Sequence, residues 1–295
     1  MVQADIQFNL KNQVTDESYS QGMVEDATLL MLAEKSRFMY AILDERRQKA
    51  VVLRDYHLIS DHNSEETYCP GFFQRILEED ELLRSIQASR TVLSFFGPHQ
   101  SLVPDPLFSK DHVREILELS CSPGKNDELY ADAIASAHAH LVYAVPAALL
   151  EETGNRFQQN LVFHAASAFI ESQLRLNKHE TEAKISVLLR NRQFDLVITQ
   201  GNELKLYNSF EIHSSEDFIY FVLFCMEQLQ LNPDSVEVRC YGEIEKVTSH
   251  WMLGRKYIRN LIFGEKPEGM ELSYGFDRYS PHEFYPLLIQ RLCVS

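Results

Sequence analysis

Short apolar runs separated by polar turns dominate the first third of the chain. After a polar segment that ends near Asp26, with a strand-like run at Ile6–Leu10, three runs have the length and composition of β-strands. The turns between these three runs are short, which predicts an antiparallel meander. A helix and one more strand are expected next. The expected elements are the strands Ala27–Ala33, Arg37–Leu43 and Ala50–Leu58, the helix Phe72–Gln87 and the strand Thr91–Phe96.

The same order of apolar runs returns in the last third of the chain. Three strand-like runs with short polar turns precede a helix, for which Ser214 is a suitable N-cap with Asp217 three residues later. A strand with alternating pattern follows that helix. The expected elements are the strands Ala183–Leu189, Phe194–Thr199 and Leu204–Ile212, the helix after Ser214, the strand Ser235–Tyr241, and helices at Thr248–Phe263 and Pro281–Leu292.

The recurrence indicates a duplicated domain, in which Phe38 corresponds to Phe194 and Tyr56 to Phe210. The charged stretch Asn177–Glu182 is the best place for a boundary. We therefore expect a first unit over residues 1–180, with a polar N-terminal arm and inserted elements, and a second unit over residues 181–295. The inserted elements are the strands His140–Val145 and Leu161–Phe163 around a helix at Ala147–Phe157.

Two copies of a meander followed by helix, strand and helix resemble the plan of the actin-like ATPase superfamily. Within this chain, the stretch Ser186–Phe224 carries the resemblance best. The chain is most similar to an uncharacterised bacterial family with that fold. The resemblance implies an α/β fold class with mixed sheets, built from two ribonuclease-H-like halves. It also implies that a nucleotide, where one is bound, lies in the cleft between the halves.

The resemblance further implies phosphate motifs that this chain lacks. In the superfamily, the first hairpin of each half reads Asp-x-Gly-(Thr/Ser), in which the Asp handles the metal and the Gly admits phosphate. The first half has Leu32 at the Asp position and Glu34 at the Gly position, and the stretch Leu188–Arg192 of the second half has neither Asp nor Gly. A glycine pair that would hold adenosine is reduced to Gly242 followed by Glu243.

Composition supports this interpretation, because phosphate loops depend on glycine. The chain has 11 glycines among 295 residues, where average usage would give about 21. The formal net charge of -15 argues against a nucleic-acid partner. The sequences GxSxG, GxxxxGK[ST] and GxGxxG do not occur, which leaves the hydrolase, P-loop and dinucleotide interpretations without support.

Basic residues in the hairpin turns are the remaining candidates for anion contacts. Lys35 and Arg37 belong to the first turn, and Arg190 and Arg192 to the second. With Gly242, these side chains could hold an anion between the halves through charge-assisted hydrogen bonds. The alternative is that they are ordinary exposed turn residues.

A metal site has a weaker basis in the sequence. His138 and His140 are two positions apart, so on a strand both imidazoles would point to one face. A zinc site needs three or four ligands, and the sequence brings no third one there. Isolated pairs of this kind are usually structural or incidental.

Cysteine usage and hydropathy indicate a cytoplasmic protein without membrane insertion. The five cysteines include no CxxC and give no disulfide framework. The N-terminus lacks the pattern of a signal peptide. The longest apolar run, Phe218–Met226, falls far below the roughly 18 residues that a membrane span requires.

The sequence therefore favours a non-catalytic actin-like scaffold or interaction protein, with an unknown protein partner and no cofactor. A divergent ATPase or kinase is the alternative. It would use a rearranged phosphate site in the inter-domain cleft, with Lys35, Arg190 and Arg192 on the phosphates. A metal-dependent enzyme at the two histidines is a third hypothesis.

Overall fold

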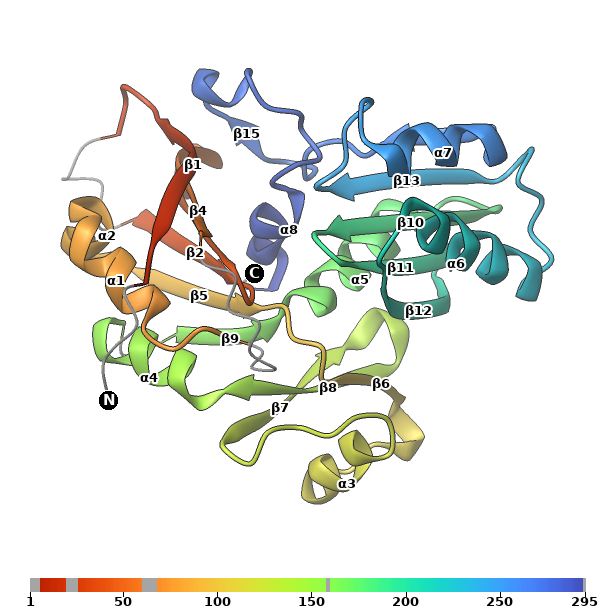
Figure 1. The fold of residues 1–295 in the computed structure, drawn as a ribbon, viewed down its shortest axis with the longest axis horizontal. Helices are drawn as coiled ribbons and strands as arrows, with labels where there is room; N and C mark the ends of the chain where they lie inside the picture. The colour runs from red at the N-terminus through yellow and green to blue at the C-terminus, as the bar shows by residue number, and fades with distance from the viewer. Residues whose placement is uncertain (1–5, 20–25, 60–67, 158–159, 294–295) are drawn as a thin grey trace.

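Three β-sheets carry the fold in the computed structural model, which describes residues 6–19, 26–59, 68–157 and 160–293 (Figure 1). The first sheet contains β1 (Phe8–Thr15), β2 (Ala27–Ala33), β3 (Arg37–Asp44), β4 (Lys49–Leu58), β5 (Arg90–Phe95), β9 (Asn160–His164) and β15 (Glu271–Leu272). The second contains β10 (Ala183–Arg190), β11 (Gln193–Gln200), β12 (Glu203–Glu211), β13 (Glu237–Gly242) and β14 (Asn260–Phe263). The third contains β6 (Gln100–Pro104), β7 (Asp127–Ile134) and β8 (Ala139–Pro146).

The two large sheets have the same topology. In the first, β2 pairs antiparallel with β3, β3 antiparallel with β4, β2 parallel with β5, and β5 parallel with β9. In the second, β10, β11 and β12 form the matching meander, and β13 and β14 follow in parallel. The predicted fold class, a mixed α/β fold with a repeated meander and parallel extension, is confirmed.

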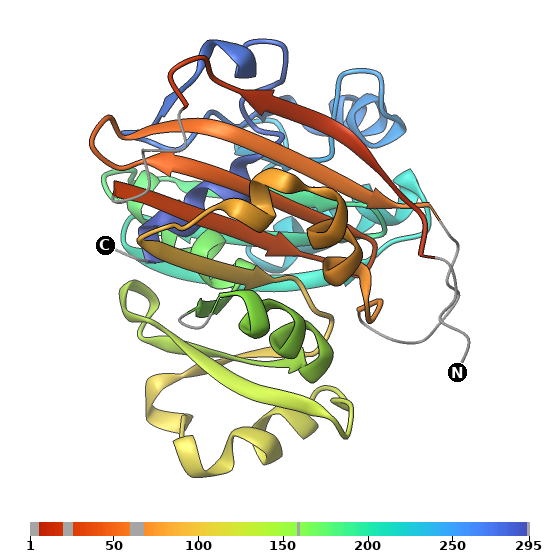
Figure 2. The same ribbon diagram turned by 90° about the vertical axis from the view of Figure 1, so that its left-hand side faces the viewer.

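The helices cover both faces of the two large sheets (Figures 1 and 2). Leu29 and Met31 of β2 pack toward α1, α2 and α4 on the outer face of the first sheet. The other face of β2 belongs to a core that also includes α5, α8 and the inner face of the second sheet. The outer face of the second sheet packs on α6 and α7. The helices are α1 (Phe72–Glu79), α2 (Glu81–Ser85), α3 (Val113–Glu118), α4 (Ala147–Arg156), α5 (Ala165–Leu176), α6 (Ser215–Gln228), α7 (Ser249–Tyr257) and α8 (Tyr285–Leu288).

The predicted helix at 72–87 is wrong in one respect, because it is broken at Asp80. This residue is extended and buried, and its carboxylate accepts from the backbone N–H of Leu83, which begins α2. The same carboxylate accepts hydrogen bonds from the hydroxyls of Tyr40 and Tyr56, both at 2.6 Å. A buried acid held by two tyrosines thus separates α1 from α2, where the run of acids alone indicates a solvated helix face.

The C-terminal helix predictions need a larger correction. The predicted helix at 248–263 ends at Tyr257, and residues 260–263 form β14, which pairs in parallel with β13. Ile258 and Leu261 are buried in the core of the second half, a spacing that fits helix and turn-plus-strand equally well. The predicted helix at 281–292 is only α8 followed by a 3-10 helix, Ile289–Cys293.

Several elements lie outside the predicted set. The helix α5 connects β9 to β10, and the third sheet with α3 is inserted between β5 and β9. Of the predicted inserted elements, β8, α4 and β9 are confirmed. The predicted strand at 6–10 is β1, which starts at Phe8, runs on to Thr15 and pairs with β4. The unit boundary between residues 180 and 181 remains a prediction, and β15 and α8 pack on strands of the first sheet.

Within the described residues, no helix is both long enough and apolar enough to cross a bilayer.

Candidate functional site

Charged side chains from both hairpins and from the end of β13 meet between the two halves. We call this set the inter-half cluster, and it contains Glu34, Arg37, Asp55, Arg190, Asp195 and Glu243. Glu34 begins the β2–β3 turn, and its backbone N–H donates to the carbonyl of Arg37 at 2.8 Å. Arg37 starts β3 and Arg190 ends β10. Each arginine therefore lies at the point where its strand meets the hairpin turn.

Arg37 is 5% exposed and is bound to carboxylates of both halves. Its Nε and Nη2 donate to the two oxygens of Asp55 at 2.7 and 3.0 Å. Its Nη1 donates to Glu243 of the second half at 2.6 Å. A bidentate guanidinium–carboxylate pair of this kind is among the strongest charge-assisted contacts in proteins. Arg37 therefore joins the first meander to the residue that follows β13.

The charge of Asp55 is stabilised although its side chain is fully buried. Burial opposes ionisation, but the hydrogen bond from His57 and the charge of Arg37 outweigh it, so the pKa of Asp55 lies below its ordinary value. Burial also acts to lower the pKa of Arg37, and the charges of Asp55 and Glu243 reverse that effect. Asp55 and Arg37 are thus both ionised at neutral pH.

Arg190 has the same kind of environment in the second half. Its Nη2 donates to Asp195 at 2.7 Å, and its guanidinium carbon lies 3.9 Å from the centroid of the Phe96 ring of the first half. The other oxygen of Asp195 accepts from Tyr207 at 3.0 Å. An arginine on an aromatic face gains from cation–π attraction, most when it is desolvated. Arg190, like Arg37, is engaged by its own protein on more than one side.

The four basic candidates therefore divide into two pairs. Arg37 and Arg190 are buried in ion pairs, whereas Lys35 and Arg192 are exposed at the two hairpin turns. Glu34 is half-buried between these groups, and burial raises its pKa although Arg37 and Arg190 act in the opposite direction. An acid with a raised pKa at the expected glycine position makes this turn a poor cradle for phosphate.

Gly242 has a structural reason to be glycine. Its φ is 81°, and a β-carbon there would lie 2.2 Å from the carbonyl oxygen of Leu189. Its backbone N–H donates to the carbonyl of His282 at 2.9 Å. The end of β13 thus lies directly against β10, an approach that only glycine permits.

Asp55 and Asp195 were missed in the sequence, whereas Glu34 and Glu243 were noted only as departures from the motif. A signal for two of them existed. Asp55 is a buried position of β4, just after the apolar run Ala50–Leu53, and Asp195 interrupts the apolar run of β11. A charged residue inside a buried strand is rarely left unpaired, so each predicts a cationic partner.

The family of the chain follows from a match over most of its length. A family model described as "Protein of unknown function (DUF3822)" matches residues 16–261. The chain belongs to the DUF3822 family. A comparison with curated proteins found no match.

Solved structures show which fold this DUF3822 member has. A Bacteroides thetaiotaomicron protein "with actin-like ATPase fold and unknown function" is 14% identical, with a TM-score of 0.73 over 83% of this chain and 93% of that one. A chain of a "PilM-PilN type IV pilus biogenesis complex" is also 14% identical, with a TM-score of 0.61 over 91% of this chain and 98% of that one. The predicted actin-like ATPase fold is confirmed.

The two candidate metal-binding histidines of this DUF3822 chain do not share a strand face. His138 precedes β8 in a left-handed turn with φ 50°, so the predicted strand geometry is wrong. His140 lies in β8, stacked on Phe108 at 3.8 Å between ring centroids, with Nδ1 3.0 Å from Asp105. In the part of the chain that the structure describes, no group of three or more His, Cys, Asp or Glu side chains could hold a metal ion.

His164 connects the site to the start of α5. Its side chain is fully buried, and Nδ1 accepts from the backbone N–H of Ala166 at 3.2 Å as an N-cap. Its Nε2 lies 3.4 Å from the carbonyl oxygen of Gly97. Burial lowers the pKa of His164 to about 4, and Arg190 acts in the same direction. The imidazole is therefore neutral in the folded protein.

This histidine predicts a loss of stability in mild acid. The unfolded chain takes up the proton near pH 6.5 and the folded chain near 4, so the stabilisation is complete above 6.5 and is lost as the pH falls toward 4. His164 alone should lower the free energy of unfolding by up to about 3 kcal/mol across that interval. Urea unfolding at closely spaced pH values measures it.

The matched variant is His164→Asn, which retains an N-cap acceptor and removes the titration. The difference between the two proteins isolates this group from the carboxyls that titrate in the same range. Parallel pH profiles for the two proteins would contradict the assignment.

Proposed function

We propose that this protein is a non-catalytic actin-like scaffold, which works through contacts with other proteins in the cytoplasm. The observation that carries the proposal is the inter-half cluster. Arg37 and Arg190, the two arginines that begin or end the hairpin strands, are already ion-paired, Arg37 with Asp55 and Glu243 and Arg190 with Asp195. A phosphate that took either arginine would leave a buried carboxylate uncompensated, which is strongly unfavourable.

The charge around the cluster also opposes an anionic ligand. The carboxylates of Glu34, Asp55, Asp195 and Glu243 surround two guanidinium groups. Burial also raises the pKa of Glu283, an effect that Arg37 opposes and Asp55 reinforces. The turns contribute neither the Asp for a metal ion nor the Gly for phosphate that the superfamily motif requires. A nucleotide site here would have to be built from other residues.

Surface features support a role in protein contacts. Tyr220 and Phe224 lie one turn apart on α6 and are 61% and 44% exposed. Met252 and Tyr257 on the neighbouring α7 are each 54% exposed. Contiguous exposed apolar side chains commonly mark interaction surfaces, and the stacked rings of Tyr220 and Phe224, with centroids 6.2 Å apart, are adjacent in this way. The likeness in fold to a chain of a PilM–PilN complex is in keeping with such a role.

The cysteines support the proposed cytoplasmic location. Cys121, Cys225 and Cys240 are free thiols, and the last two are buried. Secreted proteins of ordinary size more often pair their cysteines, because their environment is oxidising.

A thermal-shift titration with ATP, ADP and Mg²⁺ tests the proposal. We expect no change in Tm with any of them, because the arginines are already paired. A bound nucleotide at 100 times its Kd would instead stabilise the fold by about 2.7 kcal/mol. Mg²⁺ alone and inorganic phosphate serve as the matched additions.

A nucleotide-dependent shift would contradict the scaffold proposal and favour the divergent ATPase or kinase. The double variant Lys35→Ala, Arg192→Ala locates any such site, since both side chains are exposed at the hairpin turns. A shift that disappears in this variant would place phosphate at the turns.

A further inference from the structure

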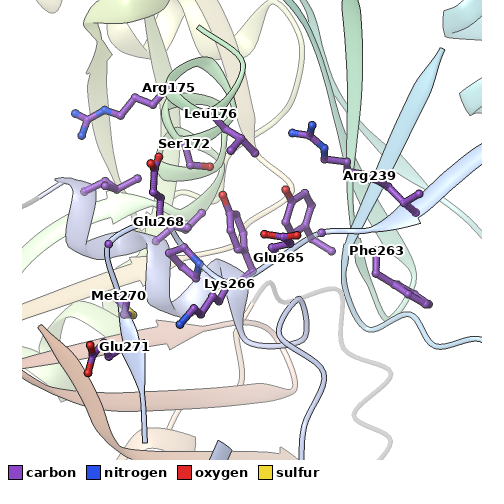
Figure 3. A pocket seen from close by; sticks show the side chains of 18 of the residues that line it. Ser172, Arg175, Leu176, Arg239, Phe263, Glu265, Lys266, Glu268, Met270 and Glu271 are labelled. Atoms are coloured by element: carbon purple, nitrogen blue, oxygen red, sulfur yellow. The ribbon is translucent and has the colours of Figure 1, made fainter. Parts of the chain in front are cut away.

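A pocket of about 1230 Å³ lies on the inner side of the second sheet, and no residue of the inter-half cluster lines it (Figure 3). On this side α5 packs against β11 and β12, and α8 covers part of β13, where the rings of Tyr285 and Tyr241 lie 4.2 Å apart. Arg239 and Tyr241 of β13 and Ile262 of β14 face the opening. Ser172 and Leu176 of α5 contribute a second wall. The pocket therefore lies at a sheet end that α5 and α8 cover only in part.

The third wall comes from the segment that returns the chain to the first sheet. Residues 264–270 run from β14 to β15 and line the pocket together with Tyr285 of α8 and Ile289. Both connections between the large sheets, α5 on the way out and residues 264–270 on the way back, thus border one cavity. Anything bound there touches both.

The size and the mouth of the pocket indicate a polypeptide rather than a small molecule. Pockets for small ligands usually measure about 300–1,000 Å³ and enclose most of their ligand, whereas this one is larger. At its mouth Leu176 is 42% exposed and Ile262 is 41% exposed. Apolar side chains of an inserted segment would cover both.

Charge is distributed unevenly over the walls. Arg239 of β13 lies on the sheet wall, whereas Arg175 of α5 points away from it and pairs with Glu171 at 3.0 Å (Figure 3). Glu265 and Glu268 lie on the returning segment, with Lys266 between them in the sequence. Arg239 is held in place, since its Nε is 2.6 Å from Glu237 and its Nη1 donates to Asn177 at 3.0 Å. A ligand of a single charge sign would meet repulsion on one of the two sides. A segment with charges of both signs would not.

We propose that this pocket is the docking site for a peptide segment of a partner protein, which places apolar side chains on Leu176 and Ile262, an acidic residue at Arg239 and a basic residue at Glu268. The inference rests on the proposed scaffold function and names the chemistry of the partner. Because the segment touches both connections between the large sheets, its binding also restricts the movement of the halves.

Site-specific photo-crosslinking in cells of the source organism tests the docking site. The photoreactive residue p-benzoylphenylalanine replaces Ile262 in the pocket, Met252 on α7, or Leu119, which is 88% exposed in the inserted region. We expect a discrete protein adduct at 262 that is absent at 119. Mass spectrometry then identifies the crosslinked segment, and the corresponding synthetic peptide is titrated against the purified full chain.

The charge variants decide whether the pocket recognises the peptide. Glu268→Lys should weaken peptide binding about tenfold or more, because it places like charges together. A lysine-to-glutamate exchange in the peptide should restore binding to that variant. Glu118→Lys makes the same charge change on the exposed surface of α3 and should leave binding unchanged.

Three results would overturn the docking site. They are no adduct at 262, equal adducts at 262 and 119, and a peptide affinity that Glu268→Lys does not alter. An adduct at 252 without one at 262 would overturn the pocket and leave the scaffold function standing. A nucleotide-induced thermal shift would contradict the scaffold function independently of the crosslinking result.

Discussion

Replacing Arg37 by alanine is expected to lower the free energy of unfolding by about 3–5 kcal/mol, the cost of breaking a buried ion pair from one side. The variant leaves Asp55, which is fully buried, without its bidentate partner, and it removes the bond at 2.6 Å to Glu243. Urea unfolding followed by circular dichroism measures the change.

Two further variants test whether the loss of stability comes from the buried ion pair and not from the removal of any arginine. Arg192→Ala removes an exposed arginine from the other hairpin and should change the free energy by no more than about 0.5 kcal/mol. The double variant Arg37→Ala, Asp55→Ala removes the uncompensated charge and should recover part of the loss. A loss below about 1 kcal/mol for Arg37→Ala would show that the pair behaves as a solvated surface contact.

The second large effect is expected for Phe169→Ala, with a loss of about 3–5 kcal/mol. Phe169 of α5 is fully buried, with ring centroids 5.7 Å from Tyr241 and 6.4 Å from Tyr285. These three rings belong to α5, the second sheet and α8, so the cavity would open where the halves meet. Thermal and urea unfolding measure the loss, and near-ultraviolet circular dichroism reports the loosened tyrosines.

Leu176→Ala is the control on the same helix, because Leu176 is 42% exposed. It should cost less than about 1 kcal/mol, since little apolar area leaves contact. Equal losses for Phe169→Ala and Leu176→Ala would contradict the proposed role of α5 as the packed layer between the sheets.

The strands of both meanders could be predicted because their apolar runs are bounded by short polar turns. The helix α5 gave no comparable signal: residues 165–170 are all buried, so it lacks the polar face that marks an amphipathic helix. The strand β14 has four residues and continues an apolar spacing that also fits the helix before it. Only tertiary pairing with β13 decides between the two conformations.

The sequence could identify the basic residues of the candidate site but hardly its acidic residues. Hairpin turns can be located locally, so Lys35, Arg37, Arg190 and Arg192 were found by position. The partner of Arg37 in the second half is 206 residues away, a separation at which no local pattern acts. Which arginine is buried and which is exposed depends on that pairing, and therefore on the folded arrangement of both halves.

The return of the chain to its first sheet has a consequence during biosynthesis. The strand β15 pairs with β4, and α8 packs against β2 and β3. While the ribosome is still adding the second half, the inner face of the first sheet lacks α8 and stays partly uncovered. Domains usually fold in order as they emerge, but here α8, which follows both large sheets in the chain, completes a layer that the first strands began. The fold of the first half is therefore finished only after the strands of the second half have been synthesised.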